Sequence, residues 1–130
     1  MTALSNYAEL KVLDHLFRNT AYTSPNAYMA LFTDDPTDAG TGTEVTGNGY
    51  ARVQIDNKMA AASSGQIVSN ADITFPTASG GAFGTITHIG IYDASTAGNL
   101  LAHGALSASR VISDGDTFQI NSGSLTITID

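Results

Sequence analysis

The period of the hydrophobic pattern changes near residue 20, and this change constrains the fold more than any other feature. Before it, Leu10, Leu13 and Phe17 recur at helical spacing. After it, apolar and polar residues alternate along short segments that are separated by Gly, Asn, Asp and Pro. No repeat of fixed period and no alternation of strands with helices is present. The pattern is typical of a mainly β, antiparallel fold.

The length and composition define the fold class further. A chain of 130 residues forms one ordinary domain and buries about two-thirds of its unfolded surface. The absence of cysteine excludes a disulfide framework and thiolate metal sites. We therefore predict a single domain over residues 1–130, with a helix over 6–18 and an antiparallel β-sandwich of about eight short strands over 27–130.

The predicted helix begins with a capping-box-like pair, Asn6 and Glu9, with Ser5 as the competing cap. A helix of three to four turns is too short to be stable alone, so its apolar stripe must dock on another surface. We expect that surface to be the chain's own sandwich, and the alternative is another subunit. The stripe consists of Leu10, Leu13, Leu16 and Phe17.

Several segments predict strands with defined faces. Residues 27–33 are apolar on both alternating faces, as in a central buried strand. In residues 71–76, Ile73 and Phe75 are expected to point inward. In residues 84–94, alternation places Ile89 and Ile91 on one face and Ile86, His88 and Tyr92 on the other. "NLLAHGALS" and "SRVIS" are expected as two further strands. The turn "SDGD" follows them, and in the last strand Leu125, Ile127 and Ile129 are expected on one side.

The segment "YARVQIDN" predicts a strand with one face exposed to water. Ala51, Val53 and Ile55 point inward, and Arg52, Gln54 and Asp56 point outward. Tyr50 stands where a long loop meets this strand. We expect its ring to plug the end of the core, and the alternative is a contact between Tyr50 or Arg52 and a partner.

The charge of the chain excludes several classes of partner. Only 13% of residues are charged, and the net charge is −7. The basic residues are scattered, so no patch is available to neutralise phosphates, and we expect no nucleic-acid binding. Acidity disfavours anionic membranes. No apolar run approaches the ~20 residues that span a bilayer. The N-terminus lacks the pattern of a secretory signal, so we expect synthesis in the cytoplasm.

The candidate catalytic and metal-binding residues are sparse. His88 and His103, with a carboxylate such as Asp93, lack the spacing of a metal site. The acidic loop 34–49 resembles no defined Ca²⁺ loop. The chain has no Gly-x-Ser-x-Gly elbow and no phosphate-binding loop. We expect no enzyme activity, no catalytic residues, no cofactor and no metal.

The loop 34–49 is the strongest candidate for contact with a partner. Loops of this length without structure of their own are uncommon in compact domains and are often functional. We predict a contact surface that combines its carboxylates with the tyrosine and the arginine that follow. The predicted residues are Asp34, Asp35, Asp38, Glu44, Tyr50 and Arg52.

Five segments, in order, resemble a family of small tailed-bacteriophage virion proteins that are often labelled tail fibre proteins. They are "LSNYAELKVLDHLFRNTAYTSP", "LFTDDPTDAGTGTEVTGNGYARV", "ADITFPTA", "GTITHIGIYDASTAGNLLAHGAL" and "LTITID". The resemblance covers nearly the whole chain. It implies a non-enzymatic component of the virion, made in the host cytoplasm and assembled in many copies with other phage structural proteins.

Three roles are compatible with the resemblance. The first is an accessory module on the particle exterior, at the tail or its fibres. The second is a capsid decoration (cement) protein that contacts the major capsid protein. The third is a module that binds host glycan through tyrosines with nearby carboxylates. The candidate tyrosines are Tyr22, Tyr28, Tyr50 and Tyr92.

Overall fold

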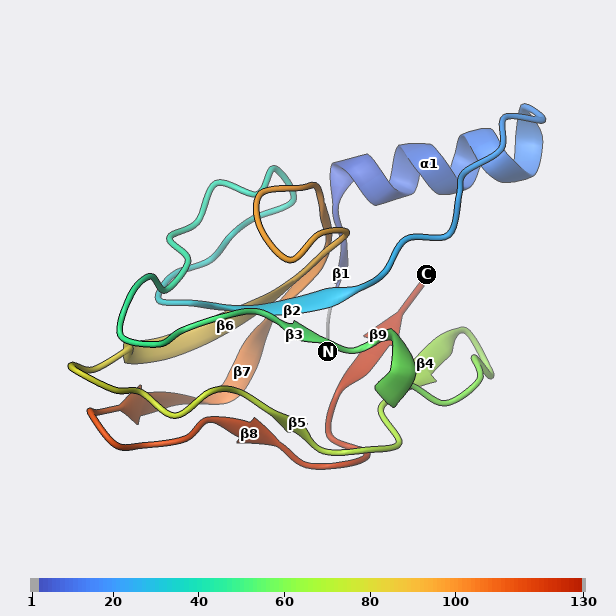
Figure 1. Ribbon diagram of the computed structural model, residues 1–130. Helices are drawn as coiled ribbons and strands as arrows, with labels where there is room; N and C mark the ends of the chain where they lie inside the picture. Colours follow the sequence, from blue (N-terminus) through green and yellow to red (C-terminus); the bar gives the residue numbers. More distant parts are fainter. Residues whose placement is uncertain (1–2, 130) are drawn as a thin grey trace.

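The computed structural model describes residues 3–129 and has two β layers with a helix beside them (Figure 1). One layer is a five-stranded sheet in the order β1-β7-β6-β2-β3, and the other consists of the two-stranded pairs β4-β9 and β5-β8. All pairings among the described residues are antiparallel. The predicted mainly β fold with one N-terminal helix is confirmed.

The described residues form nine strands, close to the expected number. The strands are β1 Ala3–Leu4, β2 Tyr28–Phe32, β3 Val53–Gln54, β4 Gln66–Val68, β5 Ile73–Thr74, β6 Gly84–Tyr92, β7 Leu100–Ile112, β8 Gln119–Ile120 and β9 Thr126–Thr128. The α-helix is α1 Asn6–Phe17, and a 3-10 turn spans Asp56–Lys58. The segments "NLLAHGALS" and "SRVIS", expected as two strands, form the single strand β7.

The main core lies between the two layers. Met29 and Leu31 of β2 face Ile73 and Phe75 of the second layer, and all four side chains are buried. The opposite face of β2 is buried as well, since Ala30 and Phe32 pack with Tyr92 and Leu100 in a second cluster. The prediction that residues 27–33 are buried on both faces is therefore confirmed, as is the inward orientation of Ile73 and Phe75.

The pairing of β6 with β7 contains a large irregular β-bulge. Ile86 pairs with Arg110 and His88 pairs with Ala105, so residues 106–109 of β7 lie opposite Thr87 alone. A bulge interrupts the alternation of side chains. Ile86 consequently enters the same core as Ile89 and Ile91, and the prediction that it lies on the opposite face is wrong.

The C-terminal strand is also shorter than predicted. Leu125 is buried and Ile127 packs against the core. Ile129 lies past the end of β9, and 57% of it is exposed, so its predicted inward orientation is wrong. The turn at Ser113–Asp116 is confirmed by the hydrogen bond from the Asp116 amide to the Ser113 carbonyl.

Helix α1 begins at the competing cap, Ser5. The Ser5 hydroxyl accepts a hydrogen bond from the Ala8 amide (3.2 Å) and donates to the Leu100 carbonyl, which joins the helix to β7. Arg18, expected as the last helical residue, is the C-cap.

The apolar stripe of α1 does not dock on the chain's own sandwich, contrary to the expectation. The exposed fractions are 63% for Leu10, 52% for Leu13, 63% for Leu16 and 76% for Phe17. The physical reason is that another side of the helix meets the body, where Ala8 is buried. Nothing helical between residues 3 and 129 has both the length and the apolar character required to cross a bilayer.

Candidate partner-contact site

Two loops that meet over one face of the five-stranded sheet build the candidate site: residues 33–52, between β2 and β3, and residues 93–99, between β6 and β7. The longer loop is closed by its own contacts. Asp34 accepts hydrogen bonds from the Thr43 amide (2.6 Å) and hydroxyl (3.0 Å), and Glu44 forms a β-bridge with Phe32. The loop is therefore folded back along the sheet rather than extended into solvent.

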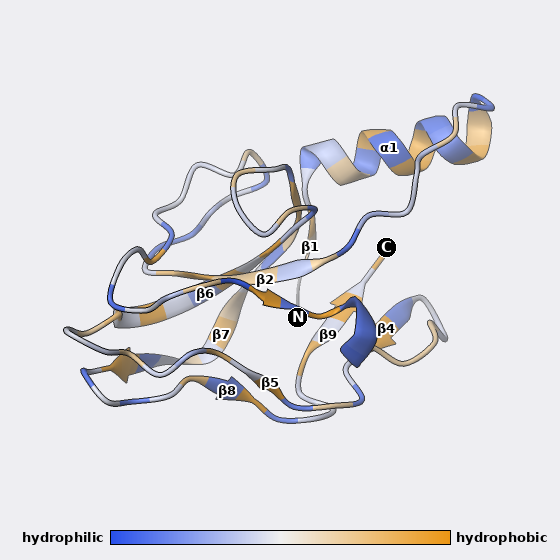
Figure 2. Cartoon of the chain, viewed as in Figure 1, coloured by the Kyte–Doolittle hydropathy of each residue, from blue (hydrophilic) through white to orange (hydrophobic). Residues whose placement is uncertain are grey.

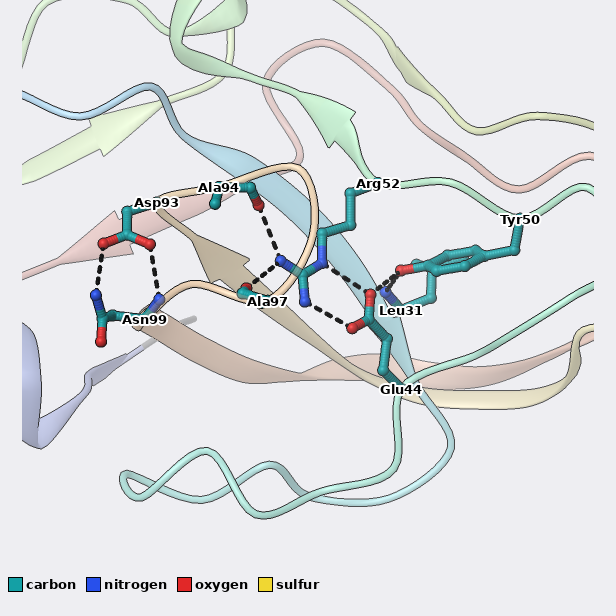
Figure 3. A network of polar contacts seen from close by, with 8 residues as sticks. All are labelled: Leu31, Glu44, Tyr50, Arg52, Asp93, Ala94, Ala97 and Asn99. Atoms are coloured by element: carbon teal, nitrogen blue, oxygen red, sulfur yellow. Dashed lines mark hydrogen bonds and ion pairs between the residues drawn. The ribbon is translucent and has the colours of Figure 1, made fainter.

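Arg52 joins the two loops (Figure 3). Its Nη2 and Nε donate to the two carboxylate oxygens of Glu44 at 2.7 and 2.9 Å, which is the strong bidentate geometry. Its Nη1 donates to the carbonyls of Ala94 and Ala97, both at 2.8 Å. The guanidinium also lies 3.9 Å from the ring centroid of Tyr92, a cation–π contact.

The Arg52 side chain is only 7% exposed, so its predicted outward, water-facing position is wrong. Alternation along "YARVQIDN" correctly placed it on the face opposite Ile55, but that face is covered by the loops. The partners of Arg52 are one acidic side chain from a loop and two backbone carbonyls from another loop. No spacing in the sequence identifies these backbone carbonyls as hydrogen-bond acceptors of an arginine.

Tyr50 plugs the end of the core, as predicted. Its ring is nearly parallel to that of Phe75 (centroids 6.3 Å apart, 9° between planes) and meets Phe83 edge-on at 5.7 Å. Its hydroxyl accepts from the Leu31 amide (3.0 Å) and donates to Glu44 Oε2 (2.8 Å). The side chains of Glu44, Tyr50 and Arg52, with the carbonyls of Ala94 and Ala97, are hereafter called the clamp.

The electrostatics of the clamp keep Tyr50 neutral and Arg52 charged near neutral pH. Burial raises the pKa of the Tyr50 hydroxyl well above its ordinary value; the Leu31 amide opposes this shift and Glu44 adds to it. Burial lowers the pKa of Arg52, but the hydrogen bonds and negative charge of Glu44 outweigh it and raise the pKa overall. Tyr50 therefore remains a donor and Arg52 a cation.

The shorter loop, residues 93–99, is closed by hydrogen bonds of its own. Asp93 accepts hydrogen bonds from the backbone amide (2.7 Å) and the side-chain amide (2.9 Å) of Asn99. Gly98 has a φ of +78°, and a Cβ there would lie 2.5 Å from Asp93 Oδ1. Only glycine fits this position, so the loop presents its Ala94 and Ala97 carbonyls to Arg52 in a fixed conformation.

The exposed border of the longer loop is acidic. Asp34, Asp35 and Asp38 are exposed and are hereafter called the acidic edge. Asp38 Oδ1 lies 2.7 Å from His103 Nε2, and Asp35 Oδ1 lies 3.6 Å from His103 Nδ1. The Asp38 carbonyl also accepts from the Asn6 amide (3.2 Å), which ties the edge to the start of α1. His103 was missed as a site residue because its carboxylate partners lie 65 or more positions away.

Two of the side chains considered as metal ligands, His88 and His103, line the same groove beside α1, but they belong to no metal-binding set among the described residues. In the register of β6 and β7, His88 pairs with Ala105 and His103 pairs with Gly90, so the histidines are not directly opposite each other. Asp93 is bound to Asn99 in its own loop. From residue 3 to residue 129, no group of three or more His, Asp or Glu side chains is arranged to hold a metal ion.

The tyrosines considered for glycan binding also lie in separate settings. Tyr92 is 9% exposed, with Phe32 stacked on its ring (6.3 Å, 11°) and Arg52 over it. Tyr28 pairs with Tyr92 in the sheet, and Tyr22 meets Tyr7 edge-on at 6.4 Å. The Tyr50 ring packs against the core.

The fold and the site define a small β-sandwich module that holds two loops in fixed positions. In a comparison with known families, residues 3–128 match the family described as Podophage GP4 fiber I protein gp80, and the chain belongs to this family of phage fibre structural proteins. The match confirms the resemblance seen in the sequence. A protein of such a family is a component of the phage particle. A search of the curated proteins found no match.

Proposed function

We propose that the chain is a non-enzymatic accessory module on the exterior of the phage particle, associated with the tail or a tail fibre. Membership of a fibre protein family supports this proposal. The observation that carries it further is the clamp, which uses a buried arginine to hold two loops together instead of forming a cavity around reactive groups. Such an arrangement presents a preformed surface, which lowers the ordering cost of binding.

The acidic edge is the proposed point of attachment to another phage structural protein. Asp34, Asp35 and Asp38 are exposed on a loop whose position is fixed by the clamp behind it. Glu44, Tyr50 and Arg52 contribute to the contact by holding that loop. A cluster of carboxylates on a chain of net charge −7 complements a basic surface, and such complementarity favours both fast and selective association.

The capsid decoration role differs from the proposed role in location and copy number. A cryo-EM map of the particle that shows the chain at the tail, in tens of copies, is the expected result. Hundreds of copies on the head shell would replace the proposal with the decoration role. The rings of Tyr50 and Tyr92 are covered by other side chains, so no observation favours glycan binding by these residues.

The attachment is tested with phage that carry the double substitution Asp35→Lys and Asp38→Lys. Replacing attraction by repulsion costs more than ~1.4 kcal/mol, which is tenfold in affinity, so we expect about a tenfold or greater loss of the chain from purified particles. Asp114→Lys is the matched control, because Asp114 is exposed on the distant turn at Ser113–Asp116. Circular dichroism of the purified variants checks the fold, and unchanged incorporation of the double variant would contradict the assignment.

A further inference from the structure

Leu10, Leu16 and Phe17 of the apolar stripe of α1 are exposed to solvent, and Leu13 borders a groove between α1 and the sheet. The returning segment covers another side of the helix: the Tyr22 ring contacts Tyr7, and the Tyr22 amide donates to His15 Nδ1 at 3.2 Å. The stripe residues Leu10, Leu13 and Phe17 follow one another at intervals of three and four, the spacing of a helix–helix seam. Figure 2 shows hydrophobic bands along this helix. An apolar stripe normally faces a core, so a stripe that faces outward calls for a partner.

A groove of about 600 Å³ lies beside the stripe, and its lining combines apolar side chains with the polar side chains of Glu9, Asp35, His88 and His103. It runs between α1 and the edge of the five-stranded sheet. Val12 and Leu13 line it on the helix side, and Leu4 and the exposed Ile129 line it on the strand side. A helix packed on the stripe therefore finds room for its own side chains in this groove.

The charges of the chain favour a second copy as the occupant. In α1 and its cap, Glu9 and Asp14 balance Lys11 and Arg18, so this region is neutral. The remaining ten acidic and three basic residues carry the whole net charge of −7. Two copies repel one another over most of their surface, and α1 is an apolar, neutral region on which they can meet.

The position of the helix determines the direction of pairing. Its N-terminal end is attached to β7 through Ser5 and its C-terminal end projects beyond the sandwich (Figure 1). A parallel pair would bring two acidic sandwiches side by side. An antiparallel pair places the sandwiches at opposite ends of the helices and sets the acidic first turn, with Glu9, beside Arg18 of the other copy.

We propose that α1 is a self-association surface, on which a second copy of this chain packs its own α1 in antiparallel orientation about a two-fold axis near Leu13. In this arrangement Leu10 faces the partner's Phe17, and Leu13 faces the partner's Leu13. The proposal rests on the proposed role as a module present in several copies per particle. It assigns self-association to α1 and attachment to the acidic edge, of which Asp35 borders the groove beside the stripe and Asp38 does not.

The absence of cysteine makes disulfide trapping a direct test. Three single variants of the full chain are oxidised in solution: Leu10→Cys, Leu13→Cys and Phe17→Cys. A disulfide requires Cα atoms within about 7 Å, which only residues near a two-fold axis reach with their own copies. We expect Leu13→Cys to cross-link with itself. Leu10→Cys and Phe17→Cys should cross-link when mixed, and much less when alone. Val111→Cys, 68% exposed and outside α1, measures random cross-linking.

Three results would overturn the proposal. Self-cross-linking of all three cysteine variants would show a parallel arrangement, and no cross-linking above the Val111→Cys level would show that the helix faces do not meet. Light scattering of the unmodified chain should give a dimer at high micromolar concentration, and a monomer there would also overturn it. Asp38→Lys alone, at an edge residue outside the groove, should lower incorporation but remain dimeric, so failure of attachment and failure of self-association are distinguished.

Discussion

The clamp and helix α1 reverse the usual positions of charged and apolar side chains. Arg52 is charged and buried, with all its contacts inside the chain, whereas the leucines of α1 are apolar and exposed. The clamp is satisfied by hydrogen bonds from two loops, so it stabilises the fold of one copy. The helix stripe contributes little to that fold and remains available for another molecule. A buried charge thus marks internal support here, and we propose that the exposed apolar residues mark a contact surface.

The strongest test of this comparison is Arg52→Ala. The change leaves Glu44 without its cationic partner and removes the hydrogen-bond donor to two loop carbonyls. Breaking a buried ion pair from one side costs about 3–5 kcal/mol. We expect the free energy of unfolding to fall by about that amount in a denaturant titration.

Arg52→Lys is the matched control for the geometry of the clamp. Lysine keeps the charge but cannot reproduce the planar bidentate pair or the stacking on Tyr92, so we expect an intermediate loss. If Arg52→Ala were as stable as the parent chain, the clamp would have no structural role, and the contrast with α1 would fail.

The next effect in size is that of Tyr50→Phe. It leaves the Leu31 amide without its partner and removes one of the two donors to Glu44 Oε2, which together costs about 2 kcal/mol at neutral pH. The hydroxyl has a raised pKa, so its stabilisation is fully present below its unfolded pKa of about 10 and is lost as the pH rises above that value. We expect the melting temperature of the parent chain to fall steeply above about pH 10, and the melting temperature of the variant to fall less steeply. An equal decline in both would contradict the role of Tyr50.

Ser5→Ala tests how firmly α1 is attached. The change removes the N-cap bond to Ala8 and the bond to Leu100, and loss of such a cap costs about 1 kcal/mol. We expect a small fall in the free energy of unfolding and faster amide hydrogen exchange in the first turn of α1. Unchanged exchange would indicate that Tyr7 and Tyr22 hold the helix without its cap.

The smallest effect on stability is expected for the stripe itself. Leu10→Gln with Phe17→Gln changes two exposed side chains, and surface substitutions usually alter the free energy of unfolding by less than about 0.5 kcal/mol. The same variant should lose the dimer in light scattering. A large fall in stability of the monomer would show that the stripe supports its own fold after all.

The sequence contains local information about these elements but little about their tertiary partners. Alternation and apolar runs predict β2, β5 and the helix, because each of these elements depends on residues that are close together in the sequence. Ile86 was assigned to the wrong face because the bulge depends on how β6 pairs with β7. The environment of Arg52 was missed because two of its hydrogen-bond acceptors are backbone carbonyls. Every residue has a backbone carbonyl, so no sequence pattern marks the two that accept from Arg52.

The large bulge in β7 also determines where this protein tolerates inserted residues. Residues 107–109 are exposed and have no partner in β6, while Gly104 and Arg110 on either side remain in register with it. Extra residues at this point would lengthen a surface excursion without shifting the pairing on either side. The middle of the longest strand, rather than a loop between strands, is therefore the place where we expect a short epitope to be accepted without harm to the fold.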